Sequence, residues 1–182
     1  MSNYLILASS PRENGNSDKL AEAFYKGALS AGQKAKILYI RNMTVGGCKG
    51  CEYCYEHNGA CCQMDDMQTV YKYLDDTDVI VFATPIYYQA FPSQLKAVID
   101  RLYVTENRSF PIKGAVLLAT YASQGKEMSE ATISYYKTLI AYHGWANLGI
   151  VVKDCMDDPS DIDENEVLNV AFNLGASIEV CS

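Results

Sequence analysis

Five short apolar segments alternate with five amphipathic segments along this chain, and no other feature constrains its fold as strongly. The apolar segments are rich in β-branched and aromatic residues and predict strands, and the segments between them predict helices. One of them contains the unbroken apolar run Val79 to Ala83, as expected where both faces of a sheet are covered. The predicted strands are 4–8, 35–40, 78–84, 115–121 and 147–152, and the predicted helices are 17–31, 65–75, 93–104, 127–143 and 163–178. Five such units predict an α/β, doubly wound fold, in which helices cover both faces of a parallel sheet.

Size and composition narrow the kind of protein. The 182 residues predict a single domain spanning 1–182, and 49% hydrophobic residues predict a compact chain rather than a disordered one. A formal net charge of −7 argues against nucleic acid or an anionic membrane as a partner, since both favour a basic surface. The chain passes directly into the first predicted strand, without the pattern of a signal peptide or a membrane span. We therefore expect a cytoplasmic protein whose seven cysteines are thiols or metal ligands.

A polar turn separates the first predicted strand from the first predicted helix, and it reads SSPRENGNS over 9–17. A helix start carries unpaired N–H groups and the positive end of the helix dipole, so a turn in this position attracts anions. The turn lacks the G-x-G-x-x-G dinucleotide spacing and the lysine of a nucleotide P-loop, which favours a lone phosphomonoester as the ligand. The alternative is an ordinary N-cap turn. Gly15 allows close approach of the backbone, and the polar side chains available are Ser9, Ser10, Arg12, Asn16 and Ser17.

Two further loops follow predicted strands and are expected at the same edge of the sheet, where ligands bind in open α/β folds. The loop 85–92 carries three aromatic residues between two prolines, which suits the face of a planar heteroaromatic ring. The alternative is that these aromatics cap the core or form a subunit contact. The loop 121–126 is polar and is expected to close the far side of the ring. The candidate residues of the two loops are Pro85, Ile86, Tyr87, Tyr88, Tyr121, Ala122 and Gly125.

Taken together, these segments resemble the NAD(P)H-dependent FMN reductase and flavodoxin-2 branch of the flavodoxin-like fold. The turn 9–17 is similar to that family's phosphate loop, and 83–88 followed by 92–103 is similar to its isoalloxazine loop and following helix, so the resemblance covers about 4–121. It implies a flavodoxin-like three-layer sandwich with a five-stranded parallel sheet of order 2-1-3-4-5. It also implies that 85–88 line the ribityl chain and the ring, and that the FMN phosphate is held by Ser9, Arg12, Asn16 and Ser17.

A cysteine-rich insert, 41–64, lies between the second predicted strand and the second predicted helix. Its cysteines have the spacing C-x2-C-x2-C-x6-C, which suits a cubane cluster better than zinc, because zinc sites more often use two separated C-x2-C pairs. The segment resembles the compact motif of the iron–sulfur flavoproteins, a subgroup of the same family, which implies a [4Fe–4S] cluster. Free thiols and zinc are the alternatives. The ligands implied by the resemblance are Cys48, Cys51, Cys54 and Cys61, with Cys62 as a substitute for the last.

The position of the insert after a strand predicts that it lies at the carboxyl edge of the sheet, close to the flavin. The two cysteines outside the insert, Cys155 and Cys181, are interpreted as structural. Fourteen tyrosines, several of them in these loops, predict a homodimer or homotetramer.

The functional hypothesis is an FMN-dependent oxidoreductase that passes electrons from NAD(P)H to a quinone, a flavin or a similar small acceptor. The flavin supplies the chemistry, and no residue of the chain is nominated as a catalytic acid or base. One alternative is an iron–sulfur flavoprotein or flavodoxin-like electron carrier that receives electrons from a protein such as ferredoxin. Another is a flavin- or nucleotide-sensing module without turnover.

Overall fold

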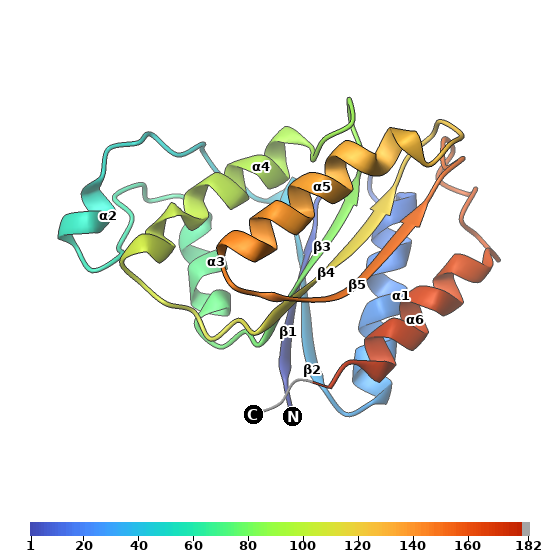
Figure 1. Ribbon diagram of the computed structural model, residues 1–182, viewed down its shortest axis with the longest axis horizontal. Coiled ribbons are helices and arrows are strands. Elements are labelled where there is room, and N and C mark those ends of the chain that lie inside the picture. The colour runs from blue at the N-terminus through green and yellow to red at the C-terminus, as the bar shows by residue number, and fades with distance from the viewer. Residues whose placement is uncertain (180–182) are drawn as a thin grey trace.

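A five-stranded parallel sheet forms the centre of the molecule. The computed structural model describes residues 1–179, so Cys181 lies outside the described residues. Neighbouring strands are all parallel and follow the order β2-β1-β3-β4-β5, which confirms the predicted fold (Figure 1). The order reverses between β1 and β3, so a crevice opens at their carboxyl ends. The strands are β1 (Asn3–Ala8), β2 (Lys34–Tyr39), β3 (Val79–Pro85), β4 (Gly114–Thr120) and β5 (Ala146–Lys153).

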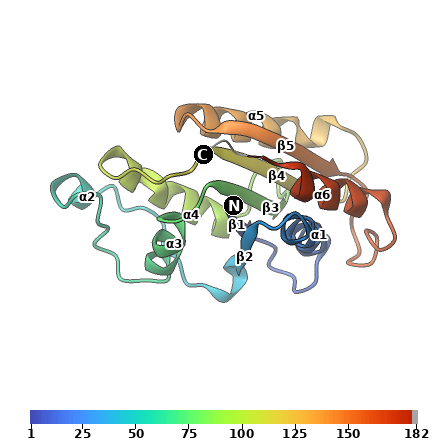
Figure 2. The ribbon, with the colours of Figure 1, turned by 90° about the horizontal axis from the view of Figure 1, so that it is seen from below.

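Helices cover both faces of the sheet (Figures 1 and 2). One layer contains α1 (Asn16–Ser30) and α6 (Glu166–Ser177), and the other contains α3 (Met67–Leu74), α4 (Ser93–Asp100) and α5 (Glu127–Tyr142). Side chains point alternately to the two faces of a strand. In β1, Tyr4 and Ile6 therefore pack with the first layer, whereas Leu5 and Leu7 pack with the second. Within residues 1–179, no helix is long and apolar enough to cross a membrane.

The two helices of the first layer cross in backbone contact. A Cβ on Gly27 of α1 would lie 1.9 Å from the Phe172 carbonyl oxygen of α6. Likewise, a Cβ on Gly175 would lie 2.2 Å from the Phe24 carbonyl oxygen. Real Cβ atoms do not approach so closely, so the crossing requires glycine at both positions. The crossing fixes α6 on α1.

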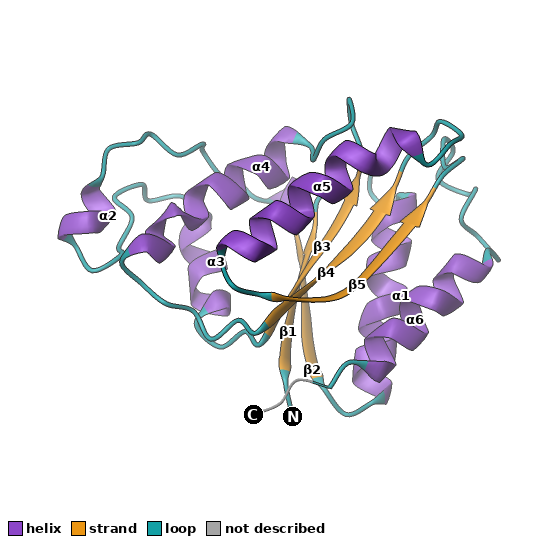
Figure 3. Cartoon of the chain, in the orientation of Figure 1, coloured by secondary structure: helices purple, strands orange, loops and turns teal. Residues whose placement is uncertain are grey.

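The structure departs from the sequence expectation at one predicted helix and at two short helices that were not predicted. The predicted helix 93–104 is α4 followed by a 3₁₀ helix, η2 (Arg101–Glu106). Leu102 stays buried in the same core cluster, so the apolar periodicity does not reveal the change of helix type. A short 3₁₀ helix, η1 (Ile40–Asn42), follows β2, and the insert contains a four-residue helix, α2 (Tyr53–Glu56), that was not predicted. Apart from α2, the segment 43–66 is loop and extends away from the sheet (Figure 3).

Candidate functional site

A cleft lies at the carboxyl ends of β1, β3 and β4. The three loops that the sequence places at this edge meet there, and the segment after β5 adds a fourth wall. Most of the predicted ligand residues line the cleft. Its lining residues are Ser10, Arg12, Gly15, Asn16, Ser17, Pro85, Ile86, Tyr87, Thr120, Tyr121, Ala122, Met156, Asp157 and Pro159.

The start of α1 gives the cleft an end that suits an anion. Gly15 is the N-cap residue and has no side chain to accept hydrogen bonds from the first turn of the helix. The first N–H groups of α1 therefore remain available at the wall formed by Asn16 and Ser17. A Cβ on Gly15 would lie 2.9 Å from Ser10 Oγ and 3.3 Å from the Arg12 carbonyl oxygen. The turn is thus packed tightly against Gly15, where a larger residue would collide with Ser10 and Arg12.

Asn16 leaves one polar atom unmatched beside the cleft. Its Nδ2 donates a hydrogen bond to the Asp158 carbonyl oxygen at 2.8 Å, which makes Oδ1 the acceptor of this side chain. Oδ1 is buried and has no hydrogen-bond partner among residues 1–179. A buried acceptor without a donor costs free energy. The cleft therefore suits a ligand that carries hydroxyl donors in addition to an anionic group.

Three predicted residues of the turn have polar groups that the protein itself uses. Ser9 Oγ donates to the Ala83 carbonyl oxygen at 3.2 Å, and Ser9 lies outside the cleft wall in which it was predicted. Ser10 Oγ donates to the Arg12 carbonyl oxygen at 2.9 Å and accepts from the Arg12 N–H at 3.1 Å. Arg12 Nη1 donates to the Asp157 carbonyl oxygen at 2.9 Å. Ser10 and Arg12 line the cleft and shape its wall.

The loop after β3 contains a tight hairpin. Tyr87 and Ala90 exchange backbone hydrogen bonds of 3.0 Å, and Tyr88 and Gln89 between them have φ angles of 48° and 61°. Two successive positive φ angles normally require glycine or asparagine, so this turn stores strain. Thr132 Oγ1 of α5 donates to the Gln89 carbonyl oxygen at 2.8 Å and holds the turn. Tyr87 lines the cleft, whereas Tyr88 is fully exposed and lies outside the predicted wall.

The loop after β4 folds back on itself. Tyr121 Oη donates to the Gly125 carbonyl oxygen at 3.0 Å. Tyr121 and Ala122 line the cleft as predicted, but Gly125 does not. Gly125 instead closes the loop behind them.

The fourth wall of the cleft was not predicted from the sequence. Met156, Asp157 and Pro159 form it, and the Met156 N–H donates to the Tyr121 carbonyl oxygen at 3.0 Å. This segment follows β5 and so starts at the ligand-binding edge, which is the signal that would have found it. Cys155, interpreted as structural, is exposed and does not pack into the core.

All five cysteines of the insert line a second, small cavity. Cys54 is buried, Cys61 is half-buried, and the other three are exposed. Among residues 1–179, no three His, Cys, Asp or Glu side chains converge as a single bound ion requires. A cubane cluster spaces its thiolates around several irons, so thiols spread over the wall of one cavity are the relevant arrangement. The lining residues are Cys48, Lys49, Cys51, Glu52, Tyr53, Cys54, Cys61, Cys62, Gln63, Arg101, Tyr103 and Val104.

The thiols of this cavity differ in their environments. Burial raises the pKa of Cys54. The Tyr53 N–H and a hydrogen bond with Cys62 lower the pKa of Cys51, whereas the same contact with Cys51 raises the pKa of Cys62. The Sγ atoms of Cys51 and Cys62 are 3.6 Å apart, and the Gly50 N–H donates to Cys48 Sγ at 3.5 Å. Cys51 is therefore the more readily ionised member of its pair.

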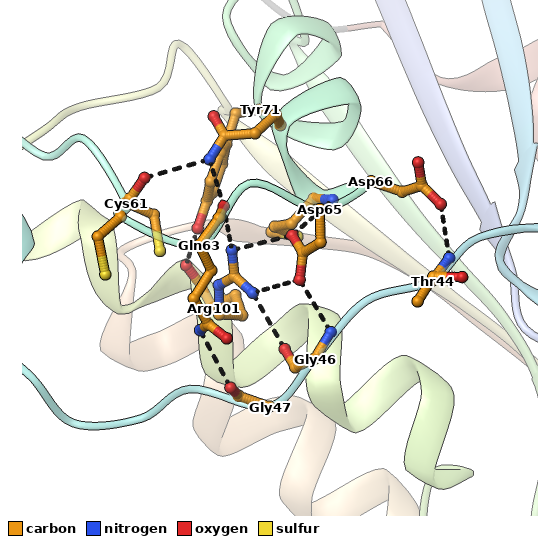
Figure 4. A network of polar contacts seen from close by, with 12 residues as sticks. Thr44, Gly46, Gly47, Cys61, Gln63, Asp65, Asp66, Tyr71 and Arg101 are labelled. Atoms are coloured by element: carbon orange, nitrogen blue, oxygen red, sulfur yellow. Dashed lines mark hydrogen bonds and ion pairs between the residues drawn. The ribbon is translucent and has the colours of Figure 1, made fainter.

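A buried arginine closes the base of the cysteine loop (Figure 4). Arg101 is 1% exposed, and its Nη1 and Nη2 donate to Asp65 Oδ2 and Oδ1 at 2.8 and 3.1 Å. The same two nitrogens donate to the carbonyl oxygens of Gly46 at 3.1 Å and Gln63 at 3.4 Å. Asp65 also accepts from the Gly46 N–H at 2.9 Å. The segments that enter and leave the cysteine loop are thereby fastened to each other and to η2.

We call the contacts of Arg101 with Asp65, Gly46 and Gln63 the clamp. Asp65 is ionised in this clamp. Burial by itself raises the pKa of the Asp65 carboxyl, but hydrogen bonds from Arg101 and the Gly46 N–H outweigh burial and hold the pKa below its ordinary value. The pair is therefore a charged, bidentate interaction, the strong form of an arginine–carboxylate contact.

The cleft and the cysteine cavity lie at opposite ends of the molecule and share no lining residue. Both views place α2 at the far end from the start of α1 (Figures 1 and 2). The expectation that the insert lies beside the flavin is therefore wrong within one chain. The insert leaves the carboxyl end of β2, but its loop extends to the far end of α4, where Arg101 holds it.

The cleft is a switch-point cleft, because it lies where the strand order reverses between β1 and β3. Together with a helix start that suits an anion and with aromatic walls, it defines a flavodoxin-like flavoprotein. The chain belongs to the NADPH-dependent FMN reductase family, whose pattern matches residues 2–151. This confirms the resemblance seen in the sequence. The protein is thus a flavin-binding oxidoreductase.

Curated relatives of this chain carry the name iron–sulfur flavoprotein. One from Methanosarcina thermophila is 29% identical over 147 residues, which cover 80% of this chain and 74% of the relative. Another from Archaeoglobus fulgidus is 28% identical over 174 residues, which cover 94% of this chain and 76% of the relative. Among solved structures, a NAD(P)H:quinone oxidoreductase from Methanothermobacter marburgensis matches with a TM-score of 0.80 at 19% identity, covering 100% of this chain and 98% of that one. At that identity the likeness concerns the fold.

Proposed function

We propose that the protein is an FMN-dependent oxidoreductase of the iron–sulfur flavoprotein type, in which a flavin site and a [4Fe–4S] site serve one electron-transfer function. The observation that carries this proposal is the presence of both cavities in one chain: the switch-point cleft and the cavity lined by five cysteines. The names of the curated relatives support the same proposal.

The cleft fits FMN in three respects. The free N–H groups at the start of α1 and the Ser17 hydroxyl suit the phosphate, and Gly15 adds no side-chain acceptor that competes for these N–H groups. The unmatched Asn16 Oδ1 suits a hydroxyl of the ribityl chain. The walls after β3 and β4 suit the ring. In this proposal the cofactor-binding residues are Ser10, Arg12, Asn16, Ser17, Pro85, Ile86, Tyr87, Tyr121 and Ala122.

A bound flavin supplies the exchange between two-electron and one-electron chemistry. The residues of the chain bind and orient it. The titratable side chains of the cleft wall are those of Arg12, Tyr87, Tyr121 and Asp157. The Arg12 guanidinium is tied to the Asp157 carbonyl oxygen, and the proposal assigns binding and orientation, not proton transfer, to these side chains. Thr132 contributes by holding the strained turn that presents Tyr87.

The donor set of the second cavity fits an iron–sulfur cluster. Thiolates are the ligands that such clusters use, and four cysteines suffice. The proposed ligands are Cys48, Cys51, Cys54 and Cys61, with Cys62 beside Cys51 as the fifth thiol. Since the two cavities lie far apart in one chain, we propose that the flavin of one subunit exchanges electrons with the cluster of another subunit, in a homodimer or homotetramer.

Purification without oxygen tests this proposal directly. The expected protein contains stoichiometric FMN and about four irons per chain, with broad absorption near 400 nm beyond the flavin bands. Protein that binds FMN but takes up no iron, even after reconstitution with iron and sulfide, contradicts the cluster and leaves the flavin site standing.

A second candidate function follows from the open cleft. Tyr87 lines it and the exposed Tyr88 lies at the tip of the adjoining hairpin, so a planar small molecule has access to an aromatic wall. This favours a reductase that takes hydride from NADH or NADPH and passes electrons to a quinone or a free flavin. Steady-state oxidation of each nucleotide with menadione tests it; ferredoxin as the electron source, with no nucleotide oxidation, supports the electron-carrier alternative.

A further inference from the structure

Arg101 has one N–H group that the clamp does not use. Its Nη1 and Nη2 bind Asp65, Gly46 and Gln63, whereas Nε is buried and has no hydrogen-bond partner among residues 1–179. An unpaired N–H of a buried cation costs more than that of a neutral group. Nε therefore marks a position where an acceptor is expected that the described part of the chain does not supply.

The surroundings of Arg101 indicate what that acceptor is. Arg101 and Cys61 line the same cavity, together with the four other thiols of the loop (Figure 4 shows Arg101 and Cys61). Burial alone lowers the pKa of the Arg101 guanidinium, but Asp65, Tyr71 and Cys61 raise it above its ordinary value, so the group remains charged. A charged donor thus lies in the wall of a cavity that it shares with five thiols and with the polar side chains of Lys49, Glu52, Tyr53, Gln63 and Tyr103. Cys61 is the thiol whose charge acts on this guanidinium.

We propose that Arg101 is a positioning residue of the cysteine site, whose Nε–H donates to the Cys61 sulfur or a neighbouring sulfide of the cluster and raises the reduction potential of the cluster. This inference rests on the cluster of the proposed function. A cluster held by four thiolates becomes more negative when it accepts an electron, and hydrogen bonds to its sulfurs stabilise the more negative state. The clamp and the donation to sulfur are separate roles, because they use different nitrogens of one guanidinium.

Asp65 offers a matched control for the clamp. It binds the two Nη atoms and leaves Nε free, so Asp65→Asn weakens the clamp without removing the proposed donor. Asp65→Asn also removes a negative charge near the cavity, which favours the reduced cluster. Arg101→Lys keeps a positive charge but lacks the Nε–H donor, and the loss of this donor disfavours the reduced cluster. The two variants therefore have opposite expected effects on the potential, although both loosen the same loop.

The test is a redox titration, followed by electron paramagnetic resonance, of the anaerobically purified wild type and both variants, with iron measured in each. We expect Arg101→Lys to lower the equilibrium constant for one-electron reduction about tenfold, which is a shift of about 59 mV to more negative potential. We expect no negative shift in Asp65→Asn. Equal potentials in Arg101→Lys and the wild type, or equal negative shifts in both variants, overturn the inference and leave Arg101 with a structural role only.

Loss of iron from Arg101→Lys is also decisive. If Asp65→Asn then keeps its iron, the clamp is dispensable and the result supports a direct contact of Arg101 with the cluster. If Asp65→Asn loses its iron as well, the clamp explains both results and the inference fails. A wild-type protein without iron overturns the proposed cluster and this inference together, and is distinguished from the other outcomes by the iron content alone.

Discussion

The flavin cleft and the cysteine cavity are built in different ways by the same chain. Each loop of the cleft begins at the end of a strand in the central sheet, and β1, β3 and β4 are buried along almost their whole length. The cysteine cavity is formed by a long loop that contains one short helix, and the contacts of Arg101 fasten the base of this loop. The cleft is thus positioned by the sheet, whereas the cavity depends on a single side chain and on what it binds.

This difference predicts which region needs its cofactor in order to fold. Parallel strands with two covered faces are rigid without a ligand, so the cleft is expected to be present in the apoprotein. Metal binding to a cysteine loop, in contrast, contributes folding free energy, because the site is not preformed. The cysteine loop should therefore be ordered by the cluster, and a change in either region should leave the cofactor of the other region bound.

The largest expected effect is that of Cys54→Ser. Cys54 is the buried thiol of the insert, so an exposed cysteine does not readily replace it. We expect iron to fall from about four per chain to background while FMN content is unchanged. Iron and flavin analysis after anaerobic purification measures both. Cys155→Ser, an exposed cysteine outside the cavity, is the matched control, and loss of flavin together with iron would show that the regions are coupled.

The converse variant is Ser17→Asp, which places a carboxylate at the start of α1. Two unit charges about 4 Å apart at an effective dielectric constant of about 20 repel by about 4 kcal/mol, so FMN should bind about a thousandfold more weakly. Titration of the apoprotein with FMN measures this, and iron content should not change. Ser134→Asp, on the exposed side of α5, is the control. Unchanged affinity in Ser17→Asp places the phosphate elsewhere.

Mixed oligomers test whether the two regions work across subunits. Ser17→Asp chains keep the cluster and Cys54→Ser chains keep the flavin, so neither homo-oligomer has both. After unfolding and refolding together, random dimers should recover about a quarter of the wild-type flavin–cluster pairs, since half of them are mixed and each has one pair. Single-turnover electron transfer between the centres measures the recovery. No recovery, in a mixture shown by mass spectrometry to contain mixed dimers, contradicts transfer between subunits.

The smallest expected effect is a loss of stability of the cysteine loop at low pH. The pKa of Asp65 is lowered in the folded protein, so its contribution to stability is present above the ordinary pKa of 3.8 and is lost as the pH falls through the lower folded value. Below about pH 4, hydrogen exchange of the loop around Gly46 should therefore accelerate relative to β3. Asp65→Asn should exchange faster at neutral pH and lack this dependence. Parallel behaviour of the two proteins excludes Asp65 as the titrating group.

The sequence predicted the sheet and most of the cleft, because both follow from local patterns. Continuous apolar runs identify the strands, and the polar turn after the first strand identifies the end of the cleft that suits an anion. The clamp was missed because Arg101 stands in an apolar helical pattern, where an arginine is expected to be exposed, and its partner Asp65 is 36 residues away. The location of the insert was mispredicted for the same reason: a long-range ion pair determines where it lies.

The fourth wall of the cleft has a consequence for the order in which the protein matures. The residues that complete the cleft, 156–159, are synthesised after all five strands, and α6 follows them. The carbonyl groups of Asp157 and Asp158, which engage Arg12 and Asn16, lie on the segment that joins β5 to α6. A domain generally folds as a unit. The cleft is therefore complete only after β1 to β5 and the segment 156–159 have been synthesised, and capture of the flavin follows the synthesis of this part of the chain.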